Sequence, residues 1–214
     1  MTTALFGFAL AATLVILAPG PDFMLVMRNT VRGGRRAGWV TGCGTLSGLT
    51  VWALAAALGL SALLRVSHVA YDVLRFCGAA YLIWLGVTSL ISFRRKRADR
   101  ASTAPDLAAL GQAPVRPARA YLNGMLSNLL NPKISVFFMA FLPAFVPAGA
   151  STSQFSLVLG AWFIAETGLW LAVVAWLADR GVRWLRRPTV QRWLERITGI
   201  VLIGFGLRLA TESR

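Results

Sequence analysis

The sequence is poor in charged residues, and in acidic ones above all. Only 14% of its 214 residues are charged, against roughly 25% in a soluble domain, and eight acidic residues stand against 22 basic ones. It has one histidine, His68, and two cysteines, Cys43 and Cys77. A metal site rich in histidine or cysteine is therefore not expected, and nothing in the sequence calls for a cofactor.

Hydrophobic residues make up 57% of the sequence, and many of them form long apolar runs. A membrane-spanning helix needs roughly 20 apolar residues. The runs predict an all-α integral protein of the cell membrane with six transmembrane helices, at residues 4–27, 38–64, 71–93, 121–147, 155–178 and 197–210. The last span is short, and we expect it to begin near Val190 with an interfacial turn. His68 then falls in a loop, and the cysteines lie near opposite membrane faces, too far apart for a disulfide.

Most of the basic residues fall in three of the five predicted loops. The first loop holds Arg28, Arg32, Arg35 and Arg36, and the third and fifth loops hold the other arginine clusters. Loops rich in arginine and lysine stay in the cytoplasm, so we expect both termini outside it. Contact with anionic lipid explains the net charge of +14, and we expect no nucleic-acid partner.

The predicted spans form two halves of three. Residues 1–93 and 121–214 flank the only long loop, residues 94–120, which is basic and then Ala/Pro-rich, with a short surface helix expected at 106–110. The stretch "ILAPGPDFMLVM" in the first half resembles "NLLNPKISVFFM" in the second. A second copy of three spans enters the membrane in the opposite direction. The sequence therefore predicts two inverted three-helix repeats, a plan common to secondary transporters.

Helix-breaking residues interrupt the first and fourth predicted spans. Pro19, Gly20 and Pro21 break the first, and Asn131 and Pro132 break the fourth. Non-helical backbone at membrane depth is tolerated only where protein or a water-filled cavity surrounds it. The half-helices that follow run in opposite directions with their N-termini turned toward each other, which suits a carboxylate. The preceding halves offer carbonyl groups for an ammonium, so the breaks predict a site for an α-amino acid, with plain structural kinks as the alternative.

Two charges follow these breaks directly, and a third lies in the fifth span. Asp22 is either a helix cap or a titratable ligand for an ammonium, and Lys133 pairs with Asp22, with Glu166 or with a substrate carboxylate. A charge at mid-bilayer costs at least ~2.5 kcal/mol, so Glu166 needs a reason to be there. It is either the structural partner of Lys133 or the group that couples transport to protons, with Asp22 as the alternative proton carrier.

Small and polar residues recur on one face of two spans. One set contains Asn123, Ser127 and Asn131 with Asn128 beside them, and the other contains Thr41, Thr45 and Gly48. Such faces let membrane helices approach closely, which is the interpretation we favour. Lining of a transport pathway is the alternative, and Asn128 is included among the substrate-binding candidates for that reason.

The motifs "PGPDF", "GAAYLIWLGVTSL", "NPK" and "AETGLW" together resemble the amino-acid exporters of the lysine-efflux and threonine/homoserine-lactone-efflux (LysE/RhtB) family, closest to the threonine branch. The resemblance implies a carrier, not an enzyme, that exports threonine- or homoserine-like or other small amino acids in exchange for protons. Its partners would be the substrate, protons and the lipid bilayer, with a homodimer compatible with the sequence. A membrane-embedded enzyme and a non-transporting assembly partner are the competing hypotheses.

Overall fold

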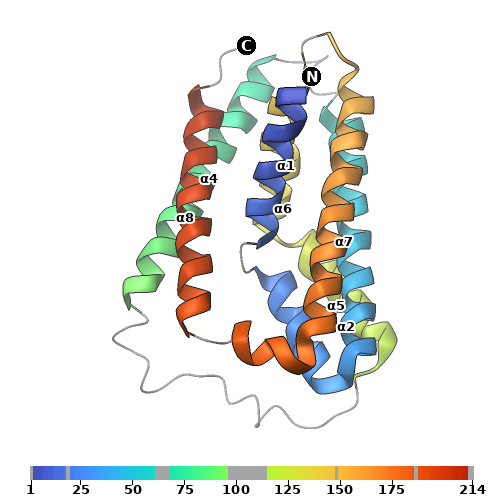
Figure 1. The fold of residues 1–214 in the computed structure, drawn as a ribbon. Coiled ribbons are helices and arrows are strands. Elements are labelled where there is room, and N and C mark those ends of the chain that lie inside the picture. The colour runs from blue at the N-terminus through green and yellow to red at the C-terminus, as the bar shows by residue number, and fades with distance from the viewer. Residues whose placement is uncertain are drawn as a thin grey trace.

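The computed structural model describes residues 2–17, 20–60, 68–95, 115–147, 149–185 and 188–211. Every regular element in these ranges is helical (Figure 1). In chain order they are α1 (Thr2–Leu17), α2 (Pro21–Ala55), η1 (Ala56–Leu60), α4 (His68–Arg95), α5 (Pro117–Leu129), α6 (Pro132–Val136), η2 (Phe137–Phe141), η3 (Leu142–Phe145), α7 (Thr152–Leu185) and α8 (Pro188–Thr211). The predicted all-α class is confirmed for these residues.

The first predicted span is broken where the sequence indicated. α1 ends at Leu17, Gly20 has extended backbone with φ −118° and ψ 179°, and α2 starts at Pro21. Proline suits this first helical position because its missing N–H has no partner within the helix there. Pro19, the remaining predicted member of this break, lies outside the described residues.

The first predicted loop is much shorter than the sequence suggested. α2 continues past Met27 to a turn at Gly34, whose φ of 72° lies in the left-handed region that glycine tolerates best. Helix resumes at once, so the described chain reverses direction over very few residues. The prediction placed the boundary too early because apolar character ends at Met27 while helical hydrogen bonding continues through the arginines that follow.

The fourth predicted span also breaks at the expected place. α5 ends at Leu129, α6 begins at Pro132, and the two axes differ by 50°. α6 continues as the π-helical η2 and the 3-10 helix η3. Helix α5 begins at Pro117, so residues 117–120 belong to it and not to the predicted linker.

The remaining helices follow the other predicted spans with longer ends. α4 covers the third, α7 the fifth and α8 the sixth, which begins at Pro188 as a full helix instead of an interfacial turn. His68 is the first residue of α4, so its predicted place in a loop was wrong. Residues 96–114 of the predicted linker, including the expected helix at 106–110, lie outside the described residues. Cys43 and Cys77 are both free thiols, as expected.

Glycines bring two pairs of helices into close contact. A side chain at Gly44 of α2 would collide with the carbonyl of Tyr121, and one at Gly124 of α5 with the carbonyl of Thr41. At the α4–α8 contact, a Cβ on Gly86 would lie 2.6 Å from the carbonyl oxygen of Gly199. Small residues permit this approach of helix backbones in membrane proteins. The contact of α2 with α5 matters most here, because it aligns the two broken spans.

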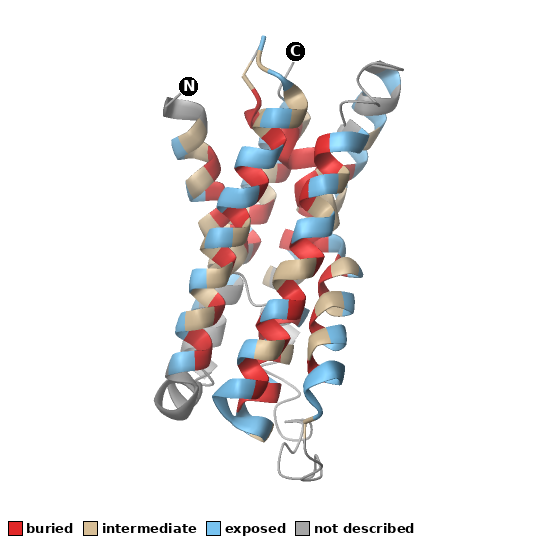
Figure 2. Ribbon diagram, turned by 90° about the vertical axis from the view of Figure 1, so that its right-hand side faces the viewer, coloured by how far each residue is buried: buried red, intermediate tan, exposed pale blue. Residues whose placement is uncertain are grey.

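Phenylalanines fill the centre of the bundle around η2. The ring centroids of Phe137 and Phe163 are 4.9 Å apart, and those of Phe8 and Phe137 are 5.9 Å apart. Buried residues face the inside of the bundle on each helix, as Figure 2 shows. The irregular η2 and η3 segments are therefore enclosed by protein, the condition for such backbone at membrane depth.

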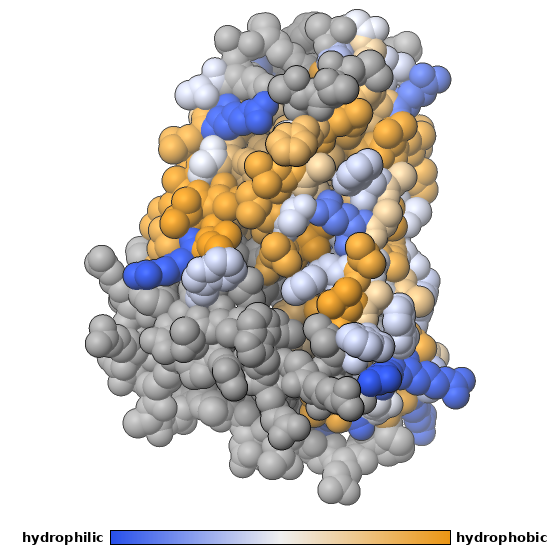
Figure 3. All heavy atoms as spheres, in the orientation of Figure 1, coloured by the Kyte–Doolittle hydropathy of each residue, from blue (hydrophilic) through white to orange (hydrophobic). Residues whose placement is uncertain are grey.

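The outer surface carries large apolar side chains, as expected of a face against lipid. Phe6, Leu130 and Leu169 are each more than two-thirds exposed, and apolar side chains cover much of the face in Figure 3. Pro21–Gly59 and Thr152–Trp176 are long and apolar enough to cross a membrane, and the bent pair of α5 with α6–η3 is a third candidate span. These agree with the predicted membrane class, while the six-span inverted repeat stays a prediction.

The described chain ends and the basic turns lie at opposite ends of the bundle. The start of α1 and the end of α8 lie together at one end in Figure 1. The turn of α2 at Gly34, the end of α4 and the start of α5 lie at the other. The arginine-rich turn of α2 thus shares one end of the molecule with the end of α4 and the start of α5.

Candidate functional site

The two helix breaks meet at Asp22. One carboxylate oxygen of Asp22 accepts a hydrogen bond from the Ser127 hydroxyl at 2.8 Å. The other accepts from the side-chain amides of Asn128 and Asn131, each at 3.0 Å. All three donors come from α5 and the break that follows it, although Asp22 begins α2. Asp22 therefore does not act as a local helix cap; it ties the first break to the second.

Lys133 makes the reciprocal connection. Its ammonium donates to the backbone carbonyl of Val15 at 3.1 Å, in the last turn of α1, and it lies within electrostatic reach of Asp22. Asp22 and Lys133 are each 9% exposed. Each charge that follows a break thus contacts the helix that precedes the other break. This crossed pattern places an anion and a cation around one cavity inside the bundle.

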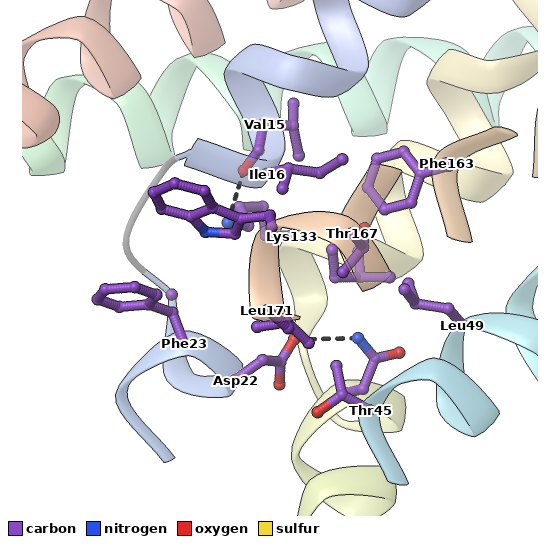
Figure 4. A pocket seen from close by; sticks show the side chains of 14 residues that line it. Val15, Ile16, Asp22, Phe23, Thr45, Leu49, Lys133, Phe163, Thr167 and Leu171 are labelled. Carbon is purple, nitrogen blue, oxygen red and sulfur yellow. Dashed lines mark hydrogen bonds between the residues drawn. The ribbon is translucent and has the colours of Figure 1, made fainter. Parts of the chain in front are cut away.

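A small cavity lies between these charges. Its volume is about 40 Å³, and it is lined by Val15, Ile16, Gly20, Asp22, Phe23, Thr45, Leu49, Asn128, Lys133, Ile134, Phe163, Thr167, Trp170 and Leu171. Figure 4 shows Lys133 beside Val15 and the Asp22 carboxylate on another side of the cavity, with Thr45 nearby. The volume holds a few water molecules but is far below the roughly 300–1,000 Å³ of ligand pockets. The cavity is therefore too small in this conformation for a ligand of that size.

Several polar atoms around the cavity have no hydrogen-bond partner among the described residues. They are the side-chain carbonyl oxygen of Asn128, the hydroxyl of Thr167 and the indole N–H of Trp170, all three buried. Buried polar groups in proteins are nearly always paired. Their concentration around one cavity indicates a place for water or for a polar ligand.

The two helix starts at the cavity differ in capping. Asn131 caps α6, because its side-chain oxygen accepts a hydrogen bond from the Lys133 backbone N–H at 3.1 Å. Gly20 precedes α2 and supplies no side-chain cap. The first N–H groups of a helix have no partner within it and attract negative charge. The start of α2 is thus the better of the two for a carboxylate.

A second, open groove lies on the basic side of Asp22. It has a volume of about 450 Å³ and is lined by Pro21, Met24, Leu25, Arg28, Asn123, Leu126, Ser127 and Leu130. Ser127 lines this groove and donates to Asp22, which lines the cavity. The hydrogen bond from Ser127 to Asp22 therefore connects the wall of the groove with the wall of the cavity.

The arrangement of broken helices around paired charges can be compared with known proteins. The family model for the LysE type translocator matches residues 13–213 of the chain. The chain belongs to the LysE type translocator family. It is thus a membrane translocator and not an enzyme.

Relatives of this translocator match over nearly their whole length. The uncharacterized membrane protein YrhP of Bacillus subtilis (strain 168) is 32% identical over 207 residues, 96% of this chain and 97% of its own. The homoserine/homoserine lactone efflux protein of Salmonella typhi is 31% identical over 207 residues, 96% of this chain and 95% of its own. The threonine efflux protein of Escherichia coli (strain K12) is 29% identical over 207 residues, 94% of each chain. No solved structure matches the chain.

Glu166, the predicted proton-coupling residue, lies apart from the translocator's cavity. One of its carboxylate oxygens bonds with the Thr13 hydroxyl on α1, and the other is buried without a partner among the described residues. Lys133 instead contacts Val15 and lies near Asp22. Of the predicted pairings for Lys133, the contacts described here favour the one with Asp22.

The predicted substrate-binding residues that the structure describes converge, with one addition from α7. Gly20, Asp22, Asn128 and Lys133 line the cavity, Pro21 lines the groove, and Asn131 and Pro132 form the second break. Gly48 packs against Asn128, so the interpretation of that face as a helix contact is supported, although Thr45 also lines the cavity. The sequence interpretation missed Phe163, Thr167 and Trp170. Their spacing of four and three residues places them on one helix face and could have indicated them.

No group of three or more histidine, cysteine, aspartate or glutamate side chains gathers among the described residues. The chemistry available at the cavity is that of hydrogen bonding and charge pairing, which suits binding and release of a small polar molecule.

Proposed function

We propose that the protein is a secondary exporter that moves small amino acids, threonine- or homoserine-like ones among them, out of the cytoplasm. The single observation that carries the proposal is the crossed contact of Asp22 and Lys133 around one buried cavity at two helix breaks. Broken helices at the interface of two repeats form the substrate site in many secondary transporters. The proposal includes the two inverted repeats, residues 1–93 and 121–214.

The charges around the cavity match both ends of an α-amino acid. The substrate carboxylate would lie between the Lys133 ammonium and the uncapped start of α2. The substrate ammonium would donate to Asp22 and to the unpartnered side-chain oxygen of Asn128. A carboxylate has about four acceptor positions, and three donors reach Asp22, so one remains.

The polar side of the groove, with Arg28, Asn123 and Ser127, supplies the entry route from the basic end of the molecule, beside apolar groove residues that face lipid. The groove is larger and more open than the cavity, and Ser127, which lines the groove, donates a hydrogen bond to Asp22 of the cavity. Because basic loops face the cytoplasm, a substrate in the groove comes from the cytoplasmic side. Breaking the bond from Ser127 to Asp22 would join the groove to the cavity, and reforming it would enclose the substrate.

Glu166 is our proposed proton carrier, with Asp22 as the alternative. The Thr13 hydroxyl lies within bonding distance of both the Ala9 carbonyl, at 2.9 Å, and Glu166, but it has one proton to donate. Ionised Glu166 would accept that proton's hydrogen bond. Protonated Glu166 would donate to Thr13, which would then donate to Ala9. The pair can thus bond in both protonation states, as a reversible proton site requires.

Transport by the purified protein in liposomes is the decisive experiment. Vesicles loaded with radiolabelled threonine should release it faster when a pH gradient directs protons inward against the substrate flow. The same vesicles without a gradient should still exchange internal for external threonine. Retention of every amino acid of a panel, under both conditions, would favour a non-transporting assembly partner.

Cysteine labelling tests the orientation of the first three-span repeat in the membrane. With Cys43 and Cys77 replaced, single cysteines are placed at Thr2 and at Ser102. An impermeant thiol reagent added to intact cells should label position 2 and spare position 102 if both termini lie outside. Labelling of position 102 alone would reverse the orientation, and labelling of both would contradict the three spans expected between the two positions, and with them the three-span first repeat.

A further inference from the structure

The cavity-facing part of α7 holds two polar groups without partners. Thr167 and Trp170 are three residues apart, so they share one face of the helix, and both line the cavity. The Thr167 hydroxyl and the Trp170 indole N–H are buried and have no hydrogen-bond partner among the described residues. The charges proposed to bind the α-amino and α-carboxylate groups of the substrate give neither Thr167 nor Trp170 a role.

Packing fixes both side chains in place. The Trp170 ring stacks on Phe23 with centroids 6.2 Å apart and planes 14° apart, and Thr167 is 8% exposed. The Thr167 hydroxyl and the Trp170 indole N–H are therefore both held inside the bundle, although the Trp170 side chain as a whole is only half-buried. A buried polar group without a partner destabilises a protein, so its presence requires an explanation.

We propose that Thr167 and Trp170 determine which substrate side chain is accepted, by hydrogen bonding to an oxygen on it. The proposal rests on the exporter function above and deepens it. The indole N–H only donates, while the threonine hydroxyl donates and accepts, so the matching group is a neutral side-chain oxygen such as a hydroxyl. The other walls at this part of the cavity, Phe163 and Leu171, are apolar and disfavour a charged side chain.

Two isosteric substrates separate recognition of the substrate side chain from binding of its α-amino and α-carboxylate groups. Threonine and valine differ by a hydroxyl in place of a methyl group. Exchange in proteoliposomes should favour threonine over valine for the wild type, because a site built to bond a hydroxyl leaves its own polar groups unpaired with the analogue. Thr167→Val and Trp170→Phe should each lower the threonine-to-valine ratio by roughly tenfold. The loss should fall on threonine, with valine exchange unchanged or higher.

Matched controls are present in the same chain. Trp162→Phe removes an indole N–H from an exposed position on α7, and Thr50→Val removes a hydroxyl from an exposed position on α2. Both should keep the wild-type ratio. A change in the ratio as large for the controls as for the cavity variants would overturn the assignment.

Stability of the empty carrier gives a second readout. Thr167→Val removes an unpaired buried hydroxyl, so the ligand-free variant should melt at the same temperature as the wild type or higher. At the same concentration, threonine should then raise the melting temperature of the variant less than that of the wild type. A lower melting temperature of the empty Thr167→Val variant, with threonine-induced stabilisation as large as in the wild type, would overturn the proposal.

Failure here differs from failure of the exporter function. A wild type that exchanges no amino acid contradicts both proposals. If the wild type exchanges threonine, and Thr167→Val and Trp170→Phe keep the wild-type threonine-to-valine ratio, only the role of these two residues is contradicted.

Discussion

The two helix breaks have the same backbone design and opposite chemistry. Each puts a proline at the first position of a new helix and a charge directly after it, Asp22 in one and Lys133 in the other. At the second break, Asn131 caps α6 and also donates to Asp22. At the first break, Gly20 leaves the start of α2 without a side-chain cap.

This difference assigns distinct tasks to the breaks. The capped start of α6 has its own polar groups satisfied, which fixes the position of Lys133 and of the donors around Asp22. The uncapped start of α2 keeps its attraction for a negative group. We infer that the second break holds the site in shape while the first receives the substrate carboxylate, and the following variants test that division.

The largest effect is expected from Asp22→Asn. The change leaves Lys133 without its counter-charge and sets an amide N–H against a donor from α5. Removing one partner of a buried charge pair costs about 3–5 kcal/mol, so thermal stability in detergent should fall steeply and threonine exchange should be lost. Asp72→Asn, at an exposed position of α4, is the control. Normal threonine exchange by Asp22→Asn would show that the first break does not take part in substrate binding.

Glu166→Gln should have a large effect on proton coupling and little effect on substrate binding, because Glu166 belongs to neither break and does not line the cavity. Glutamine imitates the protonated carboxyl permanently, so gradient-driven efflux should disappear while exchange of threonine continues. The measurement is efflux with and without a pH gradient, beside exchange at equal pH. If Asp22→Asn keeps exchange but loses coupling, while Glu166→Gln stays fully coupled, Asp22 is the proton carrier instead.

An Asn131 series separates the cap from the contact with Asp22. Asn131→Ser keeps a capping oxygen, while Asn131→Ala removes it, and caps contribute about 0.5–2 kcal/mol. Both variants lose the donor to Asp22, so both should lower threonine exchange, but Asn131→Ala should melt at a lower temperature. Gln154→Ala, at an exposed position of α7, controls for loss of an amide. Equal melting temperatures for the two variants would show that the Asn131 cap of α6 does not contribute to the stability of the protein.

The smallest effect is expected from Gly20→Ala. The added Cβ would lie 3.2 Å from the Lys133 ammonium, so that group must shift by a few tenths of an ångström. Threonine affinity should fall by roughly threefold, about 0.6 kcal/mol, with the fold intact. Gly204→Ala on α8, where a Cβ meets nothing within 4 Å, should leave affinity unchanged. A complete loss of exchange in Gly20→Ala would mean that the first break tolerates no side chain at all.

The sequence by itself determined the membrane class, the places of the breaks and the approximate course of the helices. These are local properties: apolar runs exclude water-facing helices, and a proline lacks the N–H that a continuous helix needs at that point. Helix ends were less predictable. α2 continues through Arg28 and Arg32 to Gly34 because helical hydrogen bonds tolerate charged residues that a hydropathy criterion excludes.

Only the tertiary structure decided which partner each charge meets. Asp22 bonds with residues 105 to 109 positions away, and Lys133 with a carbonyl 118 positions away. Sequence patterns left Lys133 between Asp22 and Glu166, and left Thr167 and Trp170 without a role. The choice depends on how closely α2 and α5 approach, which Gly44 and Gly124 permit but do not by themselves specify. Electrostatic and hydrogen-bond partners are set by distances of a few ångströms, and those exist only once the helices are packed.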